Sequence, residues 1–176
     1  MTDSTINEPK SMTADEAAEF AEQVFEVARQ GDAVMLNRLL EKGLPANLRN
    51  HKGDTLLMLA SYYGHQDAVQ VLLDHKADPE IRNDNGQSPI AGAAFKGDLA
   101  VVRLLVESGA DVEGASVDGR TALMMAAMFN RTEIVDYLIE QGANPHARDA
   151  KGVSALGAAQ AMGAAETAAQ LSRLGV

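Results

Sequence analysis

The sequence predicts an all-α repeat solenoid. Gly53, Gly86, Gly119 and Gly152 recur at one constant interval, and other glycines follow the same period. A serine or threonine stands two residues after each glycine of this series, and a short apolar run follows, which is the pattern of a capped helix. Further along each period comes a second apolar run with helical spacing. A fixed period of roughly 33 residues is typical of stacked helical units that bury their apolar faces against one another.

The first expected element is a capping helix that begins after Thr13 and runs to about Arg29. Thr13 and Glu16 fit a capping box, in which each side chain accepts a hydrogen bond from the other residue's backbone. We expect residues 1–12, which are polar and aperiodic, to form a disordered leader. The apolar side of the helix is predicted to contain Ala17, Phe20, Ala21, Val24, Phe25 and Ala28.

The rest of the chain is expected to contain pairs of short helices. A glycine closes the first helix of most pairs, because glycine adopts the left-handed conformation without strain, and Asn130 takes this place once. Lys76 stands where other repeats have a glycine after the second helix, so it marks an expected weak point. The predicted divisions are 13–48 for the N-terminal capping helix with the first repeat, 49–81, 82–114 and 115–147 for the second to fourth repeats, and 148–176 for a C-terminal capping repeat.

Several positions recur in phase and make the sequence similar to a known family. The blocks Asn50 to Ala60 and Ser108 to Val112, and the Gly64-His65 pair, resemble the ankyrin repeat, and the resemblance covers residues 19 to 176. It implies helix–turn–helix units with β-turn tips, about four to five repeats with helical caps, and a small bacterial protein. The histidine of the family's Thr-Pro-Leu-His signature is absent, and its place is taken by Met58, Ala91, Met124 and Gly157.

Composition excludes several functional classes. The net charge of −10 disfavours nucleic acid as a partner, because phosphate contacts need clustered Lys and Arg. The chain has no cysteine, so disulfides, thiolate zinc sites and cysteine nucleophiles are excluded. No apolar run approaches the ~20 residues that span a bilayer, and no secretory signal is visible. We therefore expect a cytoplasmic monomer without membrane or nucleic-acid contacts.

No catalytic or metal-binding pattern is present. No two of the four histidines, His51, His65, His75 and His146, have metal-ligand spacing, and His65 is expected to be structural. A phosphate-binding loop and a nucleophile elbow are also absent. The sequence therefore predicts a protein that is not an enzyme and has no cofactor.

The resemblance implies that a partner binds the concave wall formed by turn tips and by the outer ends of the first helices. Aromatic residues and methionine gather at these helix ends and predict an exposed apolar stripe of the kind that interface cores enrich. The alternative is that some of these rings pack back onto neighbouring repeats. The candidate residues are Tyr62, Tyr63, Phe95, Lys96, Met128, Phe129 and Met162 at the helix ends, and His51, Lys52, Asp84, Asn85, Asp118, Arg120 and Lys151 at the tips.

Three functional classes remain open. The first is a non-catalytic protein–protein interaction module, with an inhibitor, an accessory protein and an immunity-type regulator of an enzyme all compatible. The alternative is a haem or small-ligand carrier linked to a catalase, since Tyr62, Tyr63 and His65 offer axial ligands. A host-directed effector is the third, although no export information is visible at the N-terminus.

Overall fold

The computed structural model describes residues 11–176 and is helical, without a β-sheet in that part of the chain. The part of the expected leader in residues 1–10 lies outside the described residues. Two isolated bridges, Arg49 to Thr55 and Arg148 to Ser154, close the bases of two loops. The helices are α1 (Ala14–Gln30), α2 (Ala33–Glu41), α3 (Leu56–Tyr62), α4 (Gln66–Asp74), α5 (Pro89–Lys96), α6 (Leu99–Glu107), α7 (Ala122–Met128), α8 (Thr132–Glu140), α9 (Ala155–Ala161) and α10 (Ala165–Arg173).

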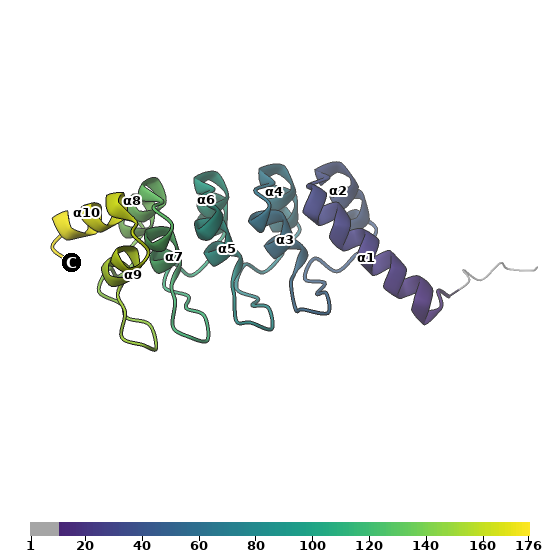
Figure 1. The fold of residues 1–176 in the computed structure, drawn as a ribbon. Coiled ribbons are helices and arrows are strands. Elements are labelled where there is room, and N and C mark those ends of the chain that lie inside the picture. Colours follow the sequence, from purple (N-terminus) through teal and green to yellow (C-terminus); the bar gives the residue numbers. More distant parts are fainter. Residues whose placement is uncertain (1–10) are drawn as a thin grey trace, which may run out of the picture.

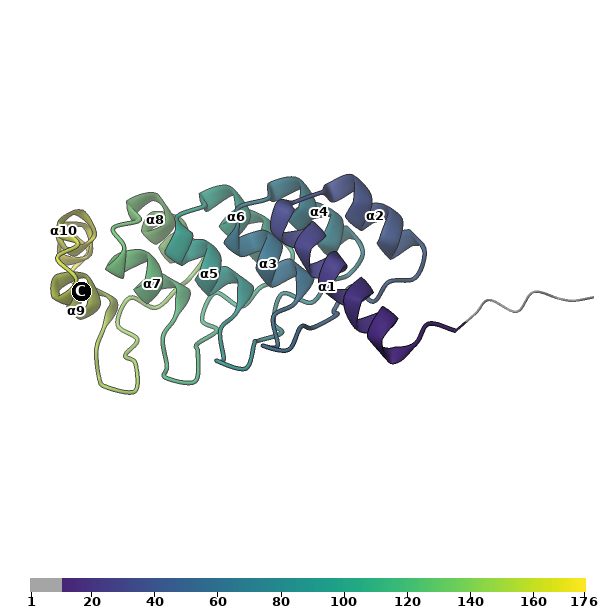
Figure 2. The same ribbon diagram turned by 45° about the vertical axis from the view of Figure 1, so that its right-hand side comes forward.

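The helices form two parallel rows (Figures 1 and 2). One row contains α3, α5, α7 and α9, and the other contains α2, α4, α6, α8 and α10 (Figure 1). The long loops before α3, α5, α7 and α9 all extend to the same side of the stack (Figure 2). The predicted all-α solenoid is therefore confirmed. The repeat divisions given above stay a prediction, although the helices of the first row begin at equal intervals, at Leu56, Pro89, Ala122 and Ala155.

The core is continuous along the stack, because each repeat places equivalent side chains between the two rows. Leu72, Leu105, Leu138 and Leu171 follow one another at the same constant interval, and all four are fully buried. Each belongs to a helix of the second row, and each of these helices contacts its neighbours in that row. No repeat can bury this leucine alone, so the stability of one repeat depends on the repeats beside it.

The capping helix α1 has the predicted cap but packs along only part of its length. The backbone of Thr13 donates to Glu16 Oε2 at 2.8 Å, and the backbone of Glu16 donates to Thr13 Oγ1 at 3.2 Å. Val24, Phe25 and Ala28 are buried against the stack. Ala17 and Phe20 are exposed, because the first half of α1 extends beyond the neighbouring helices (Figure 1). The expected apolar side of α1 therefore belongs to the core only from Ala21 onward.

Hydrogen bonds link neighbouring repeats at the C-terminal ends of α1 and α5. His65 Nε2 lies 2.6 Å from the carbonyl oxygen of Arg29 in α1, as expected for a structural histidine. Arg131, which stands two repeats later at the same position, donates to the carbonyl oxygen of Phe95 in α5 at 3.3 Å. These contacts satisfy backbone oxygens that a helix leaves free at its C-terminus.

Lys76 has the predicted left-handed backbone, with φ of 66°. Gly43, Gly109 and Gly142 stand at the equivalent positions and also have positive φ. A left-handed conformation costs a non-glycine residue about 1–2 kcal/mol. We therefore expect Lys76→Gly to raise the free energy of unfolding by about 1 kcal/mol, which should be visible as a melting temperature higher by roughly 2–4 °C.

Asn130 offers a contrast to Lys76, because its side chain has a second role. Its φ is 60°, and its Oδ1 accepts hydrogen bonds from the backbones of Glu166 and Thr167, both at 3.1 Å. Asn130 thereby caps α10, whose own N-cap residue Ala164 provides no side-chain hydrogen bond. Asn130→Gly should relieve backbone strain and lose this cap, so it should not stabilise the protein as Lys76→Gly does. Equal stabilisation by both substitutions would contradict this explanation.

Candidate functional site

A groove of about 860 Å³ runs along the stack between the loops and the first-row helices. Its floor is formed by α3, α5 and α7, through Met58, Leu59, Ala91, Gly92 and Met125. One wall is formed by the loops that precede these helices. The opposite edge is formed by Tyr62, Tyr63 and Phe95 at the helix ends.

Side chains within the loops fix the backbone of the loop wall. Asn50 Oδ1 accepts hydrogen bonds from the backbones of Lys52 and Asp54, both at 2.9 Å. The next loop repeats this arrangement around Asn83. Adjacent loops are also joined, since the backbone of Asp84 donates to the carbonyl oxygen of Lys52 at 3.0 Å. The loops therefore present their exposed side chains from an ordered backbone.

Aromatic rings form a continuous series of contacts along the other edge. The centroids of Tyr62 and Tyr63 are 5.2 Å apart in an edge-on arrangement, and Tyr62 stacks with Phe95 at 6.3 Å. The Phe95 and Phe129 rings are nearly perpendicular, with their centroids 4.6 Å apart. Tyr62 is 38% exposed and Tyr63 is 50% exposed. The two tyrosines thus offer aromatic surface to solvent while Phe95 and Phe129 connect them to the stack.

The charged groups of the groove are balanced, in contrast to the chain as a whole. The lining contains two cationic side chains, Lys52 and Arg120, and two carboxylates, Asp54 and Asp118. Arg120 Nε lies 3.2 Å from Asp118 Oδ2. A hydrogen bond donated by Ser116, followed by the charge of Arg120, holds the pKa of the Asp118 carboxyl below its ordinary value. The groove lacks the strong negative charge of the rest of the surface.

The structure brings seven of the fourteen candidate residues into the groove. These seven are Lys52, Tyr62, Tyr63, Asn85, Phe95, Asp118 and Arg120. The lining does not include His51, Asp84, Lys96, Met128, Phe129, Lys151 and Met162.

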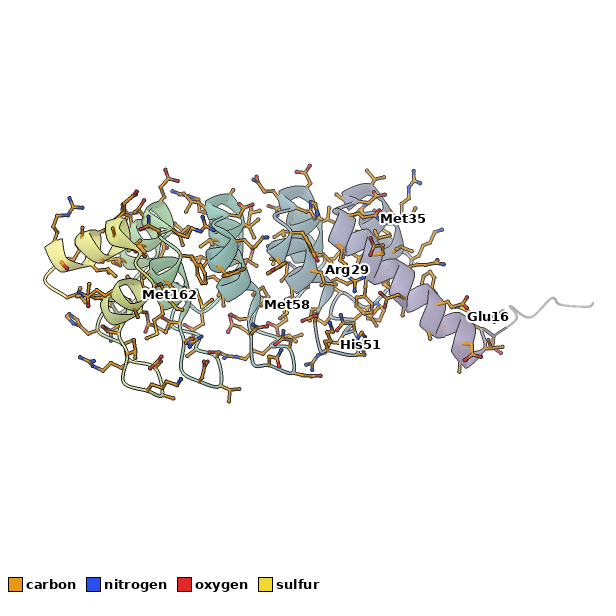
Figure 3. The ribbon with its side chains drawn as sticks, in the orientation of Figure 1. Glu16, Arg29, Met35, His51, Met58 and Met162 are labelled. Carbon is orange, nitrogen blue, oxygen red and sulfur yellow. The ribbon has the colours of Figure 1, made fainter. Side chains whose placement is uncertain are left out.

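The remaining candidates lie around the groove in different environments. Lys96 Nζ lies 4.9 Å from the centroid of the Tyr62 ring, and Asp84 lies 3.8 Å from Arg49 Nη2. His51 is at an exposed loop and Met162 is at the end of α9 (Figure 3). Met128 and Phe129 are only half-exposed. The predicted apolar stripe is therefore exposed at Tyr62, Tyr63 and Met162. Met128 and Phe129 are partly covered, so the alternative of inward packing applies in part to these two residues.

Sequence reasoning missed the floor of the groove. Leu59, Gly92 and Met125 occupy the same position in successive repeats and lie one helical turn before the ring-bearing helix ends. Residues separated by three or four positions share a helix face, so helical spacing back from Tyr62 and Phe95 would have found them. Val117, at a loop tip beside the groove, is 86% exposed, which is unusual for a β-branched apolar side chain.

Among the groups proposed as haem ligands, the imidazole of His65 already has a partner in the protein, since its Nε2 lies 2.6 Å from the carbonyl oxygen of Arg29. Within residues 11–176, no three His, Cys, Asp or Glu side chains are grouped so that they could hold a metal ion.

Known protein families include one that matches most of this chain. The family model described as ankyrin repeats in three copies matches residues 24–116, and a single ankyrin repeat matches residues 118–150. The chain belongs to the ankyrin repeat family. Ankyrin repeats are in general non-catalytic modules that bind other proteins, so the coarse functional prediction from the sequence is supported.

Several curated proteins are similar to parts of this ankyrin array. An ankyrin repeat protein of Pseudomonas aeruginosa is 58% identical over 71 residues, which are 40% of this chain and 39% of that protein. An inactive serine/threonine-protein kinase of Mus musculus is 39% identical over 57 residues, which are 32% of this chain and 4% of the kinase. Ankyrin repeat domain-containing protein 63 of Homo sapiens is 52% identical over 42 residues, 24% of this chain and 11% of that protein. The chain thus covers well under half the length of each.

None of the helices in residues 11–176 combines the length and the apolar character that crossing a membrane requires.

Proposed function

We propose that this ankyrin array binds a segment of another protein in the concave groove and catalyses no reaction itself. The observation that carries the proposal is the series of ring contacts from Tyr63 through Tyr62 to Phe95 beside an open groove of about 860 Å³. Tyrosines that are rigid, partly exposed and connected to the core are typical anchors of protein interfaces.

The surroundings of the rings support the same proposal. The loop wall presents the amide side chains of Asn85 and Gln87, which can donate to and accept from a bound backbone. The balanced charge of the lining permits approach of a segment that the acidic remainder of the surface would not favour. The bound partner is then inhibited, stabilised or recruited, as by an inhibitor, an accessory protein or an immunity-type regulator of an enzyme. We place this activity in the cytoplasm, in a monomer that contacts neither nucleic acid nor membrane.

Tyr63→Ala should weaken partner binding by roughly tenfold or more, because the substitution removes half-exposed ring surface at the edge of the groove. The immobilised protein would be used to capture partners from an extract of its source cells, and the affinity of the captured protein would then be measured. Because Tyr63 is not part of the buried core, the melting temperature should change little.

Val34→Ala is the matched control, since Val34 is 65% exposed on α2 and lies outside the groove. It should leave the affinity unchanged. A captured partner that binds the Tyr63→Ala and Phe95→Ala proteins as tightly as the wild type would show that the groove is not the binding surface.

A further inference from the structure

Gly92 lies inside α5 at a place where the fold does not require glycine. It is not among the glycines with positive φ. A Cβ atom added at Gly92 would meet only Tyr62 Cδ2 within 4 Å, at 3.6 Å, which is an ordinary van der Waals contact. Glycine is also a poorer helix former than alanine in a helix interior. Neither backbone conformation nor packing therefore excludes an alanine at this position.

The floor of the groove is hollowed at Gly92. The equivalent residues of the neighbouring first-row helices are Leu59 in α3 and Met125 in α7, and both line the groove. The half-buried Met125 and the buried Leu59 thus stand on either side of Gly92, while the Tyr62 and Phe95 rings border it at the edge. The absence of a side chain at Gly92 leaves room in the groove for one bulky apolar group between the loop wall and the rings at the helix ends.

The charges around the hollow indicate what accompanies this apolar group. Asp54 accepts hydrogen bonds from Asn50 and Asn83, and Asp118 accepts from Ser116 and pairs with Arg120. The carboxylates of the groove are thus engaged within the protein.

The two lysines of this region, unlike its carboxylates, are not paired with an opposite charge. Within the described residues, Lys52 and Lys96 form no ion pair with a carboxylate, although the chain as a whole has a net charge of −10. Lys52 lies in the lining, and Lys96 lies against the Tyr62 ring at the edge. Charge complementarity therefore favours an acidic group on the bound molecule.

We propose that the hollow over Gly92 receives one large apolar side chain of the bound protein segment, with an aspartate or glutamate beside it that pairs with Lys52 or Lys96. This inference rests on the proposed function, since it specifies which segment the groove selects. Gly92 then determines specificity by leaving space, and the two lysines determine it by charge.

The test uses random dodecapeptides displayed on phage and selected on the full chain. Fluorescein-labelled copies of the selected peptides are then measured by fluorescence anisotropy. The expected peptides share one Leu, Met or Phe beside an Asp or Glu. Gly92→Leu, which fills the hollow, should weaken their binding roughly 30-fold or more, and Gly92→Ala should weaken it less. Lys52→Ala combined with Lys96→Ala should weaken it and remove most of its dependence on salt.

Controls separate a blocked hollow from a damaged fold. Ala161→Leu introduces the same side chain at an exposed position of α9 outside the groove and should not change binding. Leucine is a better helix former than glycine, so the Gly92→Leu protein should melt no lower than the wild type.

The possible outcomes distinguish this inference from the proposed function. The inference would be overturned, and the groove proposal would stand, if the selected peptides bind the Tyr63→Ala protein weakly but the Gly92→Leu protein as tightly as the wild type. The same holds if the peptides lack the shared apolar and acidic residues. Peptides insensitive to both substitutions, or a selection that yields no binder, would count against both.

Discussion

Leu105→Ala should lower the free energy of unfolding by about 2–5 kcal/mol, the range for truncating a fully buried leucine. Leu105 lies in α6 at the centre of the stack and has no exposed surface. Its removal leaves a cavity between repeats that the neighbouring helices α4 and α8 help to enclose. Because each repeat is stabilised mainly by its neighbours, loss at the centre should weaken the repeats on both sides.

Leu171→Ala is the matched comparison, since it removes the same atoms from an equally buried leucine of α10. α10 belongs to the last repeat and has neighbours on one side only. Here we expect local unfolding of the C-terminal repeat, while the repeats before it keep their stability. Urea unfolding followed by circular dichroism and amide hydrogen exchange would distinguish the two. If Leu105→Ala also unfolds only its own repeat, the stack is less cooperative than this structure indicates.

The architecture could be predicted from the sequence because the same physical requirement recurs in each repeat. Glycines with left-handed φ end the helices at fixed intervals, and Lys76 and Asn130 were recognised as exceptions because they interrupt that series. The capping box of α1 was likewise visible, since it depends on two residues only three positions apart. Local rules of this kind do not depend on the rest of the fold.

The groove was predicted less completely, since its shape depends on contacts between repeats. The sequence indicates that Tyr62, Phe95 and Phe129 lie at helix ends, but it does not reveal that their rings contact one another and cover part of their surface. Phe20 and the rest of the first half of α1 are exposed because the helix extends beyond its neighbours at the end of the stack. The amphipathic pattern of α1 does not reveal this. The role of Asn130 as a cap for α10 also needs the two repeats to be placed side by side.

Gly31→Ala should be among the most destabilising substitutions of a surface glycine, at about 2–4 kcal/mol. Gly31 ends α1 with φ of 73°, so any side chain there is strained. A Cβ atom would in addition lie 2.2 Å from His65 Cγ and 2.7 Å from His65 Cβ. Since the backbone of His65 fixes the position of its Cβ, rotating the imidazole cannot relieve both contacts. The backbone at Gly31 or His65 has to shift, and the contact of His65 with the carbonyl oxygen of Arg29 is then lost.

Gly163→Ala measures the cost of the left-handed backbone alone, without the steric contact that Gly31→Ala makes with His65. Gly163 stands at the equivalent position with φ of 69°, and a Cβ atom there would meet nothing within 4 Å. It should cost only about 1–2 kcal/mol, from the left-handed backbone. A double-mutant cycle gives the more direct evidence. If the His65 side chain is the obstacle, Gly31→Ala added to His65→Gly, which removes both Cγ and Cβ, should cost no more than Gly163→Ala does alone. Additive losses in urea unfolding would instead place the penalty in the α1 backbone, and His65 would then not be the contact that requires glycine at residue 31.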